Sequence, residues 1–146
     1  MAGTVKPVPE GYHTVTPYLT VANVAQLLEF LKRAFGAEEK EKMAGPDGTI
    51  RHAEARIGDS VVMMGQAGDQ WKARTATLYL YVPDVDAVYQ RALAAGGKSI
   101  QELQTQFYGD RTAAVQDAQG NDWWIASRVE DVSPEEMQRR AAAAGR

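Results

Sequence analysis

The strongest hydrophobic pattern in the chain is an apolar stripe at helical spacing. Its members are Val24, Leu27, Leu28, Leu31 and Phe35. Asn23 precedes the stripe, and an asparagine side chain can cap the first turn of a helix. Gly36 follows the stripe and can take the left-handed conformation in which many helices end. The pattern therefore predicts a helix between these two residues.

Shorter runs rich in β-branched and aromatic residues, separated by turn-forming residues, predict strands on both sides of this helix. In the first half of the chain they cover residues 14–21, 39–43, 50–57 and 60–64. In the second half they cover residues 77–82, 99–104, 112–117 and 122–127, with a second helical stretch from about 85 to 95. Each half thus reads strand, helix and three strands, and a polar, Gly-containing linker over residues 65–76 joins the halves.

An internal repeat relates the two halves. A shift of 61 residues takes Tyr18 onto Tyr79 and carries segment 18–24 onto 79–85. The same shift aligns the helix ends at 34–36 and 95–97 and the turn-and-strand segments at 58–64 and 119–125. Three landmarks in register at one ungapped shift indicate a duplicated unit. The sequence therefore predicts an α+β fold of two βαβββ modules, which form an open, curved mixed sheet with helices on its outer face.

We expect one domain over residues 1–137, with module one at about 12–65 and module two at about 76–128. Near the C-terminus, Ser133 is suited to cap a helix and Pro134 to occupy its first position. Glu136, three residues after the serine, completes this helix-start pattern. A short helix is predicted there, and residues 138–146 are expected to form its end and a tail.

Composition narrows the classes of function. The chain has 146 residues and a net charge of −3, without the clustered Lys and Arg that nucleic-acid binding requires. It has no cysteine, which excludes disulfides, thiolate metal sites and a cysteine nucleophile. The first ten residues lack the apolar core of a signal peptide, and no apolar run is long enough to span a membrane. These features predict a cytoplasmic protein with neither nucleic acid nor membrane as a partner.

Alternation along the predicted strands separates two faces of the sheet. The first face is almost wholly apolar and suits packing beneath helices: Pro17, Leu19, Val21, Val62, Met64, Leu78, Leu80, Val82, Trp123 and Ile125. The second mixes hydroxyls, aromatic rings and a thioether: Thr16, Tyr18, Thr20, Val61, Met63, Thr77, Tyr79, Tyr81, Asp122 and Trp124. Hydroxyls are costly to bury without partners, yet this face is too aromatic for an ordinary wet surface. We therefore expect it to line a small-molecule cleft.

Three ionisable residues on the strand at 50–57, His52, Glu54 and Arg56, share one face by the same alternation. They are expected to face the cleft, because charged groups rarely pack beneath a helix. Three roles are open to them. They can form a solvated charge ladder, an ion pair between Glu54 and Arg56, or an acid–base pair of His52 and Glu54. His52 and Glu54 are accordingly the candidate catalytic residues.

Five stretches of the chain resemble the vicinal oxygen chelate superfamily, which contains glyoxalases, bleomycin-resistance proteins and dioxygenases, and in particular its PhnB-like branch. They are residues 7–19, 34–38, 52–60, 107–111 and 130–136. The resemblance implies paired βαβββ modules that form an open cup, in a homodimer. It leaves the function open, because one fold supports many functions.

Metal-dependent members of that superfamily place a His, Glu or Gln on the first and fourth strands of each module. The resemblance implies that the corresponding positions in this chain are Thr16, Met63, Thr77 and Trp124. None is a good ligand, since hydroxyls bind weakly and an indole only donates hydrogen bonds. We therefore expect no metal and no other cofactor. The alternative is a divalent metal at a displaced site, where His52 and Glu54 would supply only two ligands.

The candidate ligand-binding residues are Thr16, Tyr18, Met63, Thr77, Tyr79, Tyr81, Tyr108, Arg111 and Trp124. Tyr79, Tyr81 and Trp124 are expected to provide aromatic walls for a planar or cationic ligand. Tyr108 and Arg111 are expected in a loop at the mouth of the cup, where the arginine either holds an anionic group or remains solvated.

Trp71 and His13 stand outside this set. Trp71, in the linker, is expected to cover the pocket or to contact a dimer partner. His13 has the opposite parity to Thr16 and is not placed in the site.

The sequence carries no nucleophilic triad, phosphate-binding glycine loop or dinucleotide motif. The predicted function is therefore metal-free binding of a small, partly aromatic molecule in the cup of a homodimer. The alternative is a metal-dependent lyase, isomerase or dioxygenase of the superfamily. A third hypothesis is metal-independent acid–base catalysis by His52 and Glu54.

Overall fold

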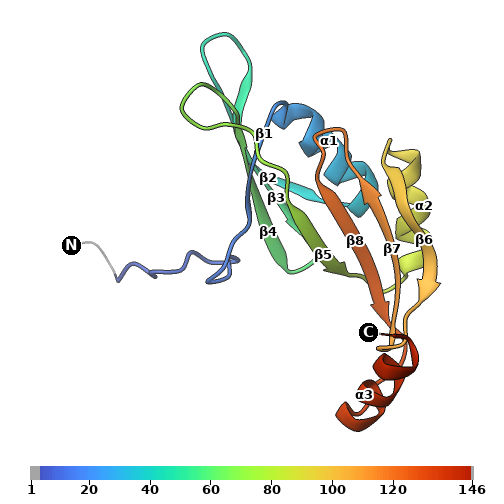
Figure 1. The fold of residues 1–146 in the computed structure, drawn as a ribbon. Coiled ribbons are helices and arrows are strands. Elements are labelled where there is room, and N and C mark those ends of the chain that lie inside the picture. The colour runs from blue at the N-terminus through green and yellow to red at the C-terminus, as the bar shows by residue number, and fades with distance from the viewer. Residues whose placement is uncertain (1–3, 146) are drawn as a thin grey trace. The chain divides into compact units, whose positions relative to one another are not determined.

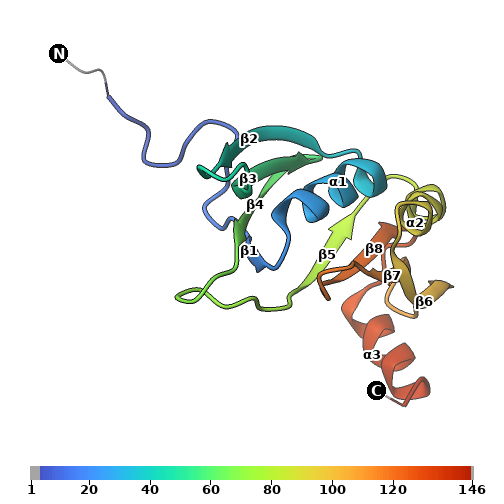
Figure 2. The same ribbon diagram turned by 90° about the horizontal axis from the view of Figure 1, so that it is seen from above.

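The computed structural model describes residues 4–145, and the chain divides into two compact units with the boundary between Thr75 and Ala76. We call these units module one and module two and describe each by itself. Each contains a four-stranded mixed sheet and a helix that follows its first strand (Figures 1 and 2). The predicted α+β class and the two βαβββ modules are confirmed, and neither four-stranded sheet closes into a barrel.

Module one consists of β1 (Tyr18–Val21), α1 (Val24–Phe35), β2 (Glu38–Ala44), β3 (Ile50–Ile57) and β4 (Ser60–Gln66). Its strand order is β1-β4-β3-β2. β1 runs parallel to β4, and the other neighbouring strands are antiparallel. The crossover from β1 through α1 therefore brings the first strand beside the last.

Module two consists of β5 (Thr77–Tyr81), α2 (Val85–Ala94), β6 (Lys98–Thr105), β7 (Asp110–Gln116), β8 (Asp122–Arg128) and α3 (Pro134–Ala143). Its strand order, β5-β8-β7-β6, repeats that of module one, with β5 parallel to β8. The 61-residue shift thus relates strands with the same neighbours and the same directions.

Local interactions explain where α1 begins and ends. The side chain of Asn23 accepts a hydrogen bond from the backbone N–H of Gln26 at 3.0 Å, as expected for an N-cap. Gly36 has a φ of 66°, in the left-handed region, and its N–H reaches the carbonyls of the last turn. Between these residues α1 buries its apolar stripe against β3 and β4. The predicted bounds of this helix are confirmed.

The first strand is shorter than predicted, because it begins at Tyr18 rather than at Thr14. The hydroxyl of Thr16 donates to the carbonyl of His13 at 3.1 Å, which closes a bend in place of an extended strand. Pro17 has no N–H to donate to a neighbouring strand, although its carbonyl accepts from Met63 N–H at 2.9 Å. Pairing therefore starts only after the proline.

The two predicted faces are present in each sheet. On the helix-facing side, Leu19, Val21, Val62 and Met64 of module one and Trp123 and Ile125 of module two are buried. On the opposite side, Tyr18, Tyr79 and Tyr81 are all exposed, while Val61 is buried. The helix-facing side is thus the core of each module, and the tyrosines lie on the side that α1 and α2 leave uncovered.

The core of module two is organised around a buried carboxylate. The indole N–H of fully buried Trp123 donates to Asp117 Oδ2 at 2.8 Å, and the amide of buried Asn121 donates to the same oxygen at 3.1 Å. Asp117 Oδ1 accepts from the backbone N–H groups of Gln119 and Asn121, which closes the turn before β8. Every polar group that this tryptophan brings into the core is therefore partnered.

The C-terminal helix α3 begins where the sequence predicts it, at Pro134, with the Ser133 hydroxyl accepting from Glu136 N–H at 3.2 Å. It continues to Ala143, so most of the predicted tail is helical. Glu136 forms ion pairs with Arg139 and Arg140, three and four residues later, which support the additional turn.

Candidate functional site

In module one the side chains on the uncovered face of the sheet form two neighbouring rows. Tyr18 lies opposite Met63, which in turn lies opposite Glu54. In the next row Gly65 lies opposite His52. The ring of Tyr18 lies over Gly65, in the space that a side chain at this position would fill. The Tyr18 hydroxyl consequently comes within 3.5 Å of His52 Nδ1, with ring centroids 5.8 Å apart.

Glu54 is the centre of a hydrogen-bonded cluster on this face and is only 6% exposed. Its Oε2 lies 2.8 Å from His52 Nε2, and its Oε1 accepts a hydrogen bond from the Tyr12 hydroxyl. The ammonium group of Lys40 lies 5.2 Å from the centroid of the Tyr12 ring. A single carboxylate is therefore held by a phenol on one oxygen and an imidazole on the other.

The electrostatics follow from these contacts. Burial raises the pKa of Glu54, but hydrogen bonds from His52 and Tyr12 outweigh it and hold the pKa below its ordinary value. The same hydrogen bond, together with burial, raises the pKa of Tyr12 to about 12. At neutral pH Glu54 is therefore an anion and Tyr12 a neutral hydrogen-bond donor.

Of the three roles considered for the charges on β3, the structure has the geometry of the acid–base pair. Glu54 bonds His52 and Tyr12 rather than Arg56, and neither His52 nor Glu54 is a fully solvated member of a charge ladder. The guanidinium group of Arg56 lies instead beside Gly11. His52 and Glu54, the candidate catalytic residues, are thus brought together.

In module two a buried carboxylate anchors two exposed aromatic rings. Asp110 is 1% exposed, and its Oδ2 accepts hydrogen bonds from Tyr79 at 2.8 Å and Tyr81 at 2.9 Å. The Nε of Arg128 lies 3.1 Å from Oδ1, an ion-pair distance. Within residues 4–145 no donor makes a well-aligned hydrogen bond to Oδ1. Tyr79 and Tyr81 are 43% and 60% exposed, with ring centroids 5.3 Å apart.

These contacts keep Tyr79 protonated. Partial burial raises its pKa, and hydrogen bonds involving Asp110 and Tyr108 raise it further. The phenol therefore acts as a permanent donor to the carboxylate at physiological pH. A ring whose hydroxyl is fixed in this way presents its face in one orientation, which lowers the entropy lost when a ligand stacks on it.

Trp124 and Thr77 complete the predicted set on β5 and β8. Trp124 is half-buried and lies opposite Tyr79, and Thr77 lies opposite Asp122 one row away. Tyr108, in the turn before β7, packs edge-on against Phe107 with ring centroids 5.2 Å apart. The structure thus brings Tyr79 and Tyr81 to the carboxylate of Asp110, and Tyr108 to the hydroxyl of Tyr79.

Arg111 is placed on the opposite face from these tyrosines. Its guanidinium group forms a bidentate ion pair with Asp86 of α2, with N···O distances of 2.9 and 3.1 Å. It also donates to the Thr105 hydroxyl at 3.3 Å. The reason is strand alternation: Asp110 points to the tyrosine face, so the next residue of β7 points toward the helix.

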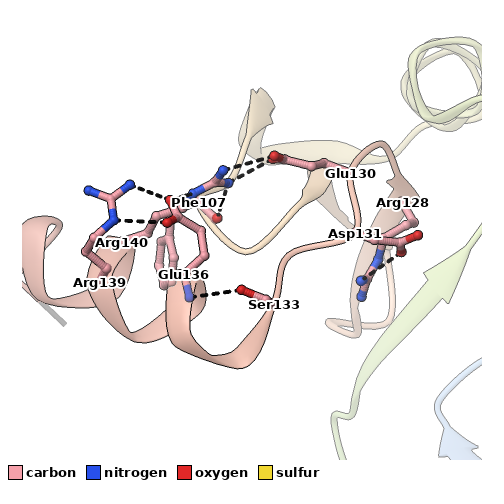
Figure 3. Close-up of polar contacts among 8 residues, drawn as sticks. All are labelled: Phe107, Arg128, Glu130, Asp131, Ser133, Glu136, Arg139 and Arg140. Carbon is pink, nitrogen blue, oxygen red and sulfur yellow. Dashed lines mark hydrogen bonds and ion pairs between the residues drawn. The ribbon is translucent and has the colours of Figure 1, made fainter.

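The turn that positions Tyr108 and Asp110 is tied to the C-terminal helix (Figure 3). The carbonyl of Gly109 accepts from the N–H groups of Val129 and Glu130, and a side chain at Gly109 would collide with the Glu130 carbonyl. Arg140 of α3 forms a bidentate ion pair with Glu130, with N···O distances of 2.8 and 2.9 Å. It also donates a hydrogen bond to the Phe107 carbonyl at 3.1 Å. Helix α3 thereby braces the turn.

Three residues of these contact networks were not among the candidate site residues from the sequence, namely Tyr12, Asp110 and Arg128. Strand alternation carries a signal for Asp110 and Arg128, because they lie opposite each other at the ends of β7 and β8. Tyr12 precedes the first strand, so no strand pattern places it. Trp71, in the linker, is 69% exposed.

The four positions at which the superfamily holds metals do not fit a metal ion in this chain. Thr16 uses its hydroxyl to bond a backbone carbonyl, Thr77 offers a neutral hydroxyl, Met63 a thioether and Trp124 only an indole N–H. Across residues 4–145, no three or more His, Asp or Glu side chains gather closely enough to hold a metal.

Comparison with known proteins finds relatives that align with most of this chain. It is 34% identical over 142 residues to an uncharacterized protein from Mycobacterium bovis, covering 90% of this chain and 93% of that protein. An uncharacterized protein from Mycobacterium tuberculosis is 34% identical over 142 residues, covering 90% and 84%. No helix within the described residues has the length and apolar character needed to cross a membrane.

Solved structures share the fold. TioX from Micromonospora sp. ML1 matches with a TM-score of 0.70 and 26% identity, over 80% of this chain and 99% of that chain. A glyoxalase-related enzyme from Fulvimarina pelagi matches with a TM-score of 0.63 and 18% identity, over 79% and 87%. The family model of the Glyoxalase/Bleomycin resistance protein/Dioxygenase superfamily matches residues 12–125. The chain therefore belongs to this superfamily.

Proposed function

We propose that the protein binds a planar small molecule, without a metal ion, on the tyrosine-bearing faces of its sheets. The observation that carries this proposal is the pair of exposed rings, Tyr79 and Tyr81, whose hydroxyls converge on the buried carboxylate of Asp110. Aromatic rings bind planar groups by stacking, and fixing their orientation in advance reduces the entropic cost of binding. Trp124, opposite Tyr79, extends the same aromatic surface.

A thermal-shift screen with planar aromatic compounds tests this function. Tyr79→Ala and Tyr81→Ala are expected to weaken binding of a confirmed ligand by roughly tenfold each, which corresponds to the ~1.4 kcal/mol of one stacking contact. Ile100→Ala is the matched control, because Ile100 is a similarly exposed apolar residue on β6. If both tyrosine variants keep full affinity for the ligand, this surface is not the binding site.

The alternative function, metal-dependent lyase, isomerase or dioxygenase activity, requires ligands that the four superfamily positions lack. Elemental analysis of protein purified without a histidine tag distinguishes the two functions. Binding without a metal predicts no stoichiometric divalent ion and no effect of added Ni²⁺, Zn²⁺, Mn²⁺ or Fe²⁺ on ligand affinity. A stoichiometric ion would favour the enzyme.

We propose that the protein belongs to the PhnB-like branch, on the resemblance of the five stretches described above, and that it forms a homodimer in the cytoplasm. Light scattering at micromolar concentration tests the dimer, and a monomer mass would contradict it. Cell fractionation tests the location.

A further inference from the structure

We propose that the uncovered face of module one binds a planar ligand through an acidic hydroxyl, a phenol or an enol, whose proton His52 accepts. This inference rests on the proposed small-molecule binding and adds the chemical class of the ligand. Its basis is the chain of contacts that runs from Tyr18 through His52 and Glu54 to Tyr12.

The carboxylate of Glu54 determines which ring nitrogen of His52 carries the hydrogen. An ionised carboxylate only accepts hydrogen bonds, so His52 Nε2, 2.8 Å from Glu54 Oε2, must be the donor. In a neutral imidazole the other nitrogen, Nδ1, then has a free lone pair. This nitrogen is the one that faces the Tyr18 hydroxyl. In this neutral form His52 presents a base, rather than a donor, to the tyrosine face.

The residues beside Nδ1 offer apolar and aromatic contacts to a flat ligand. Gly65, opposite His52, carries no side chain, and the neighbouring β2 residue Met43 is 53% exposed. Tyr18 covers Gly65, but the residue is 54% exposed and its hydroxyl is 3.5 Å from Nδ1, longer than an ordinary O–H···N hydrogen bond. A ligand hydroxyl can take its place at the nitrogen.

The proposed step is a proton transfer. The O–H bond of the ligand breaks, its electron pair stays on the ligand oxygen, and the proton forms a bond to His52 Nδ1. The imidazolium ion is stabilised by the adjacent Glu54 carboxylate, as in other acid–base pairs. The ligand oxyanion accepts a hydrogen bond from the Tyr18 hydroxyl. Atoms and charge balance without a further reactant.

The titratable groups around His52 come from its own strand, from β2 and from the segment before β1. Glu54, on the same strand, is the buried anion that bonds the ring. Tyr12 remains a neutral phenol and does not cancel the negative charge of Glu54. The ammonium group of Lys40, on β2, lies near the Tyr12 ring. Glu41, opposite Glu54 on β2, is exposed, and its charge is weakened by solvent.

The probe for this inference is para-nitrophenol, whose anion has a distinct visible absorption band. The buffer is set below the pKa of the probe, so that the free compound is neutral. Saturable appearance of the anion band on addition of protein is expected. Its methyl ether, para-nitroanisole, has the same ring but no acidic hydrogen, and should bind roughly tenfold or more weakly, as expected when a charge-assisted hydrogen bond is lost.

Two variants test the assigned groups, and circular dichroism confirms that each is folded. His52→Gln and Glu54→Gln are expected to abolish the anion band, the first by removing the base and the second by removing the counter-charge. His13→Gln is the matched control, since the chain has two histidines and His13 lies outside this contact network. An unchanged anion band in folded His52→Gln would overturn the inference.

The remaining outcomes separate this inference from the proposed function. If para-nitrophenol binds but absorbs as the neutral phenol, the proton acceptor is rejected and small-molecule binding stands. If the probe does not bind, the ligand class is rejected, and the thermal-shift screen still decides the function. NMR of isotope-labelled His52 in the His13→Gln protein provides a test without any ligand. Hydrogen on Nε2 of the neutral ring is expected, and hydrogen on Nδ1 would overturn the inference.

Discussion

Tyr18 of module one and Tyr79 of module two occupy equivalent positions of the repeat. Each lies on the first strand of its sheet, opposite a residue of the fourth strand, Met63 or Trp124. Their hydroxyls nevertheless have different partners. Tyr79 donates to the buried carboxylate of Asp110 at 2.8 Å, whereas Tyr18 lies 3.5 Å from a ring nitrogen of His52. One phenol is therefore fixed in place and the other can be displaced.

The difference extends to the third strand of each sheet. By register, the counterparts of His52 and Glu54 in module two are Thr112 and Ala114. Thr112 is fully buried, and its hydroxyl oxygen accepts hydrogen bonds from Gln101 and Gln106. Duplication has thus preserved the backbone while the chemistry has diverged. Module two presents two tyrosines that bond one buried carboxylate, and module one presents a histidine hydrogen-bonded to a glutamate.

The largest expected effect concerns the two cores. Trp123 and Val62 are equivalent by the 61-residue shift, and both are buried on the helix-facing side. Trp123→Ala is expected to lower the free energy of unfolding by about 3–5 kcal/mol, because it leaves a large cavity and strands Asp117 without the indole donor. Val62→Ala should lower the free energy of unfolding by clearly less, because it leaves a smaller cavity. Urea unfolding followed by circular dichroism measures both, and equal losses would contradict the comparison.

The next effect concerns the carboxylate that anchors the tyrosines of module two. Asp110→Asn weakens the hydrogen bonds from Tyr79 and Tyr81 and the ion pair with Arg128. It is expected to lower the free energy of unfolding by about 2 kcal/mol. It should also lower the pKa of Tyr79 toward its ordinary value, which ultraviolet titration measures. Asp86→Asn is the control. It breaks only an exposed ion pair with Arg111, which solvent screens, so the loss of unfolding free energy should be clearly smaller than for Asp110→Asn.

A smaller, pH-dependent effect concerns the Tyr12–Glu54 hydrogen bond of module one. The pKa of Glu54 is lowered, so its stabilising contribution is present above its ordinary pKa and is lost as pH falls through the lowered value. The pKa of Tyr12 is raised to about 12, so its contribution is present below its ordinary pKa and is lost as pH rises toward 12. Module two has no corresponding pair at these positions.

Tyr12→Phe is therefore expected to lower the free energy of unfolding by about 1 kcal/mol at neutral pH. It should also remove part of the stability that the wild type loses as pH rises toward 12. Glu54→Gln should remove part of the acid loss. The difference in unfolding free energy between wild type and each variant, measured from acid to alkaline pH, isolates these contributions. A difference that is constant across the whole range would contradict the assigned coupling.

Sequence patterns predicted the fold better than the site, for physical reasons. Strand alternation and the repeat correctly placed Tyr18 and Tyr79 on the uncovered face, because a sheet has only two faces. The same patterns do not specify which side chain a hydroxyl or a charge will bond. Arg111 pairs with a carboxylate on α2, and Glu54 bonds a tyrosine from the segment before β1. Such contacts depend on loop conformation and side-chain rotamers, which periodicity does not encode.

The smallest expected change in stability accompanies the most specific test of the comparison. Gly65 of module one corresponds to Ala126 of module two, and the ring of Tyr18 lies where a side chain at Gly65 would be. Gly65→Ala therefore gives module one the residue of module two and should displace the Tyr18 ring from His52. Alanine favours the strand, while the displaced ring loses packing, so the net change should stay within about 1 kcal/mol.

NMR of the His52 ring in a His13→Gln background detects the displacement, because the imidazole resonances should lose the shift caused by the nearby tyrosine ring. The reverse substitution, Ala126→Gly, should leave these resonances unchanged and cost about 0.5–1 kcal/mol from strand flexibility alone. If Gly65→Ala leaves the His52 resonances where they are, Tyr18 does not depend on the missing side chain to reach His52. The difference between Gly65 and Ala126 would then not explain why the Tyr18 hydroxyl lies near His52 while the Tyr79 hydroxyl bonds Asp110. The contrast between a displaceable and a fixed tyrosine would need another cause.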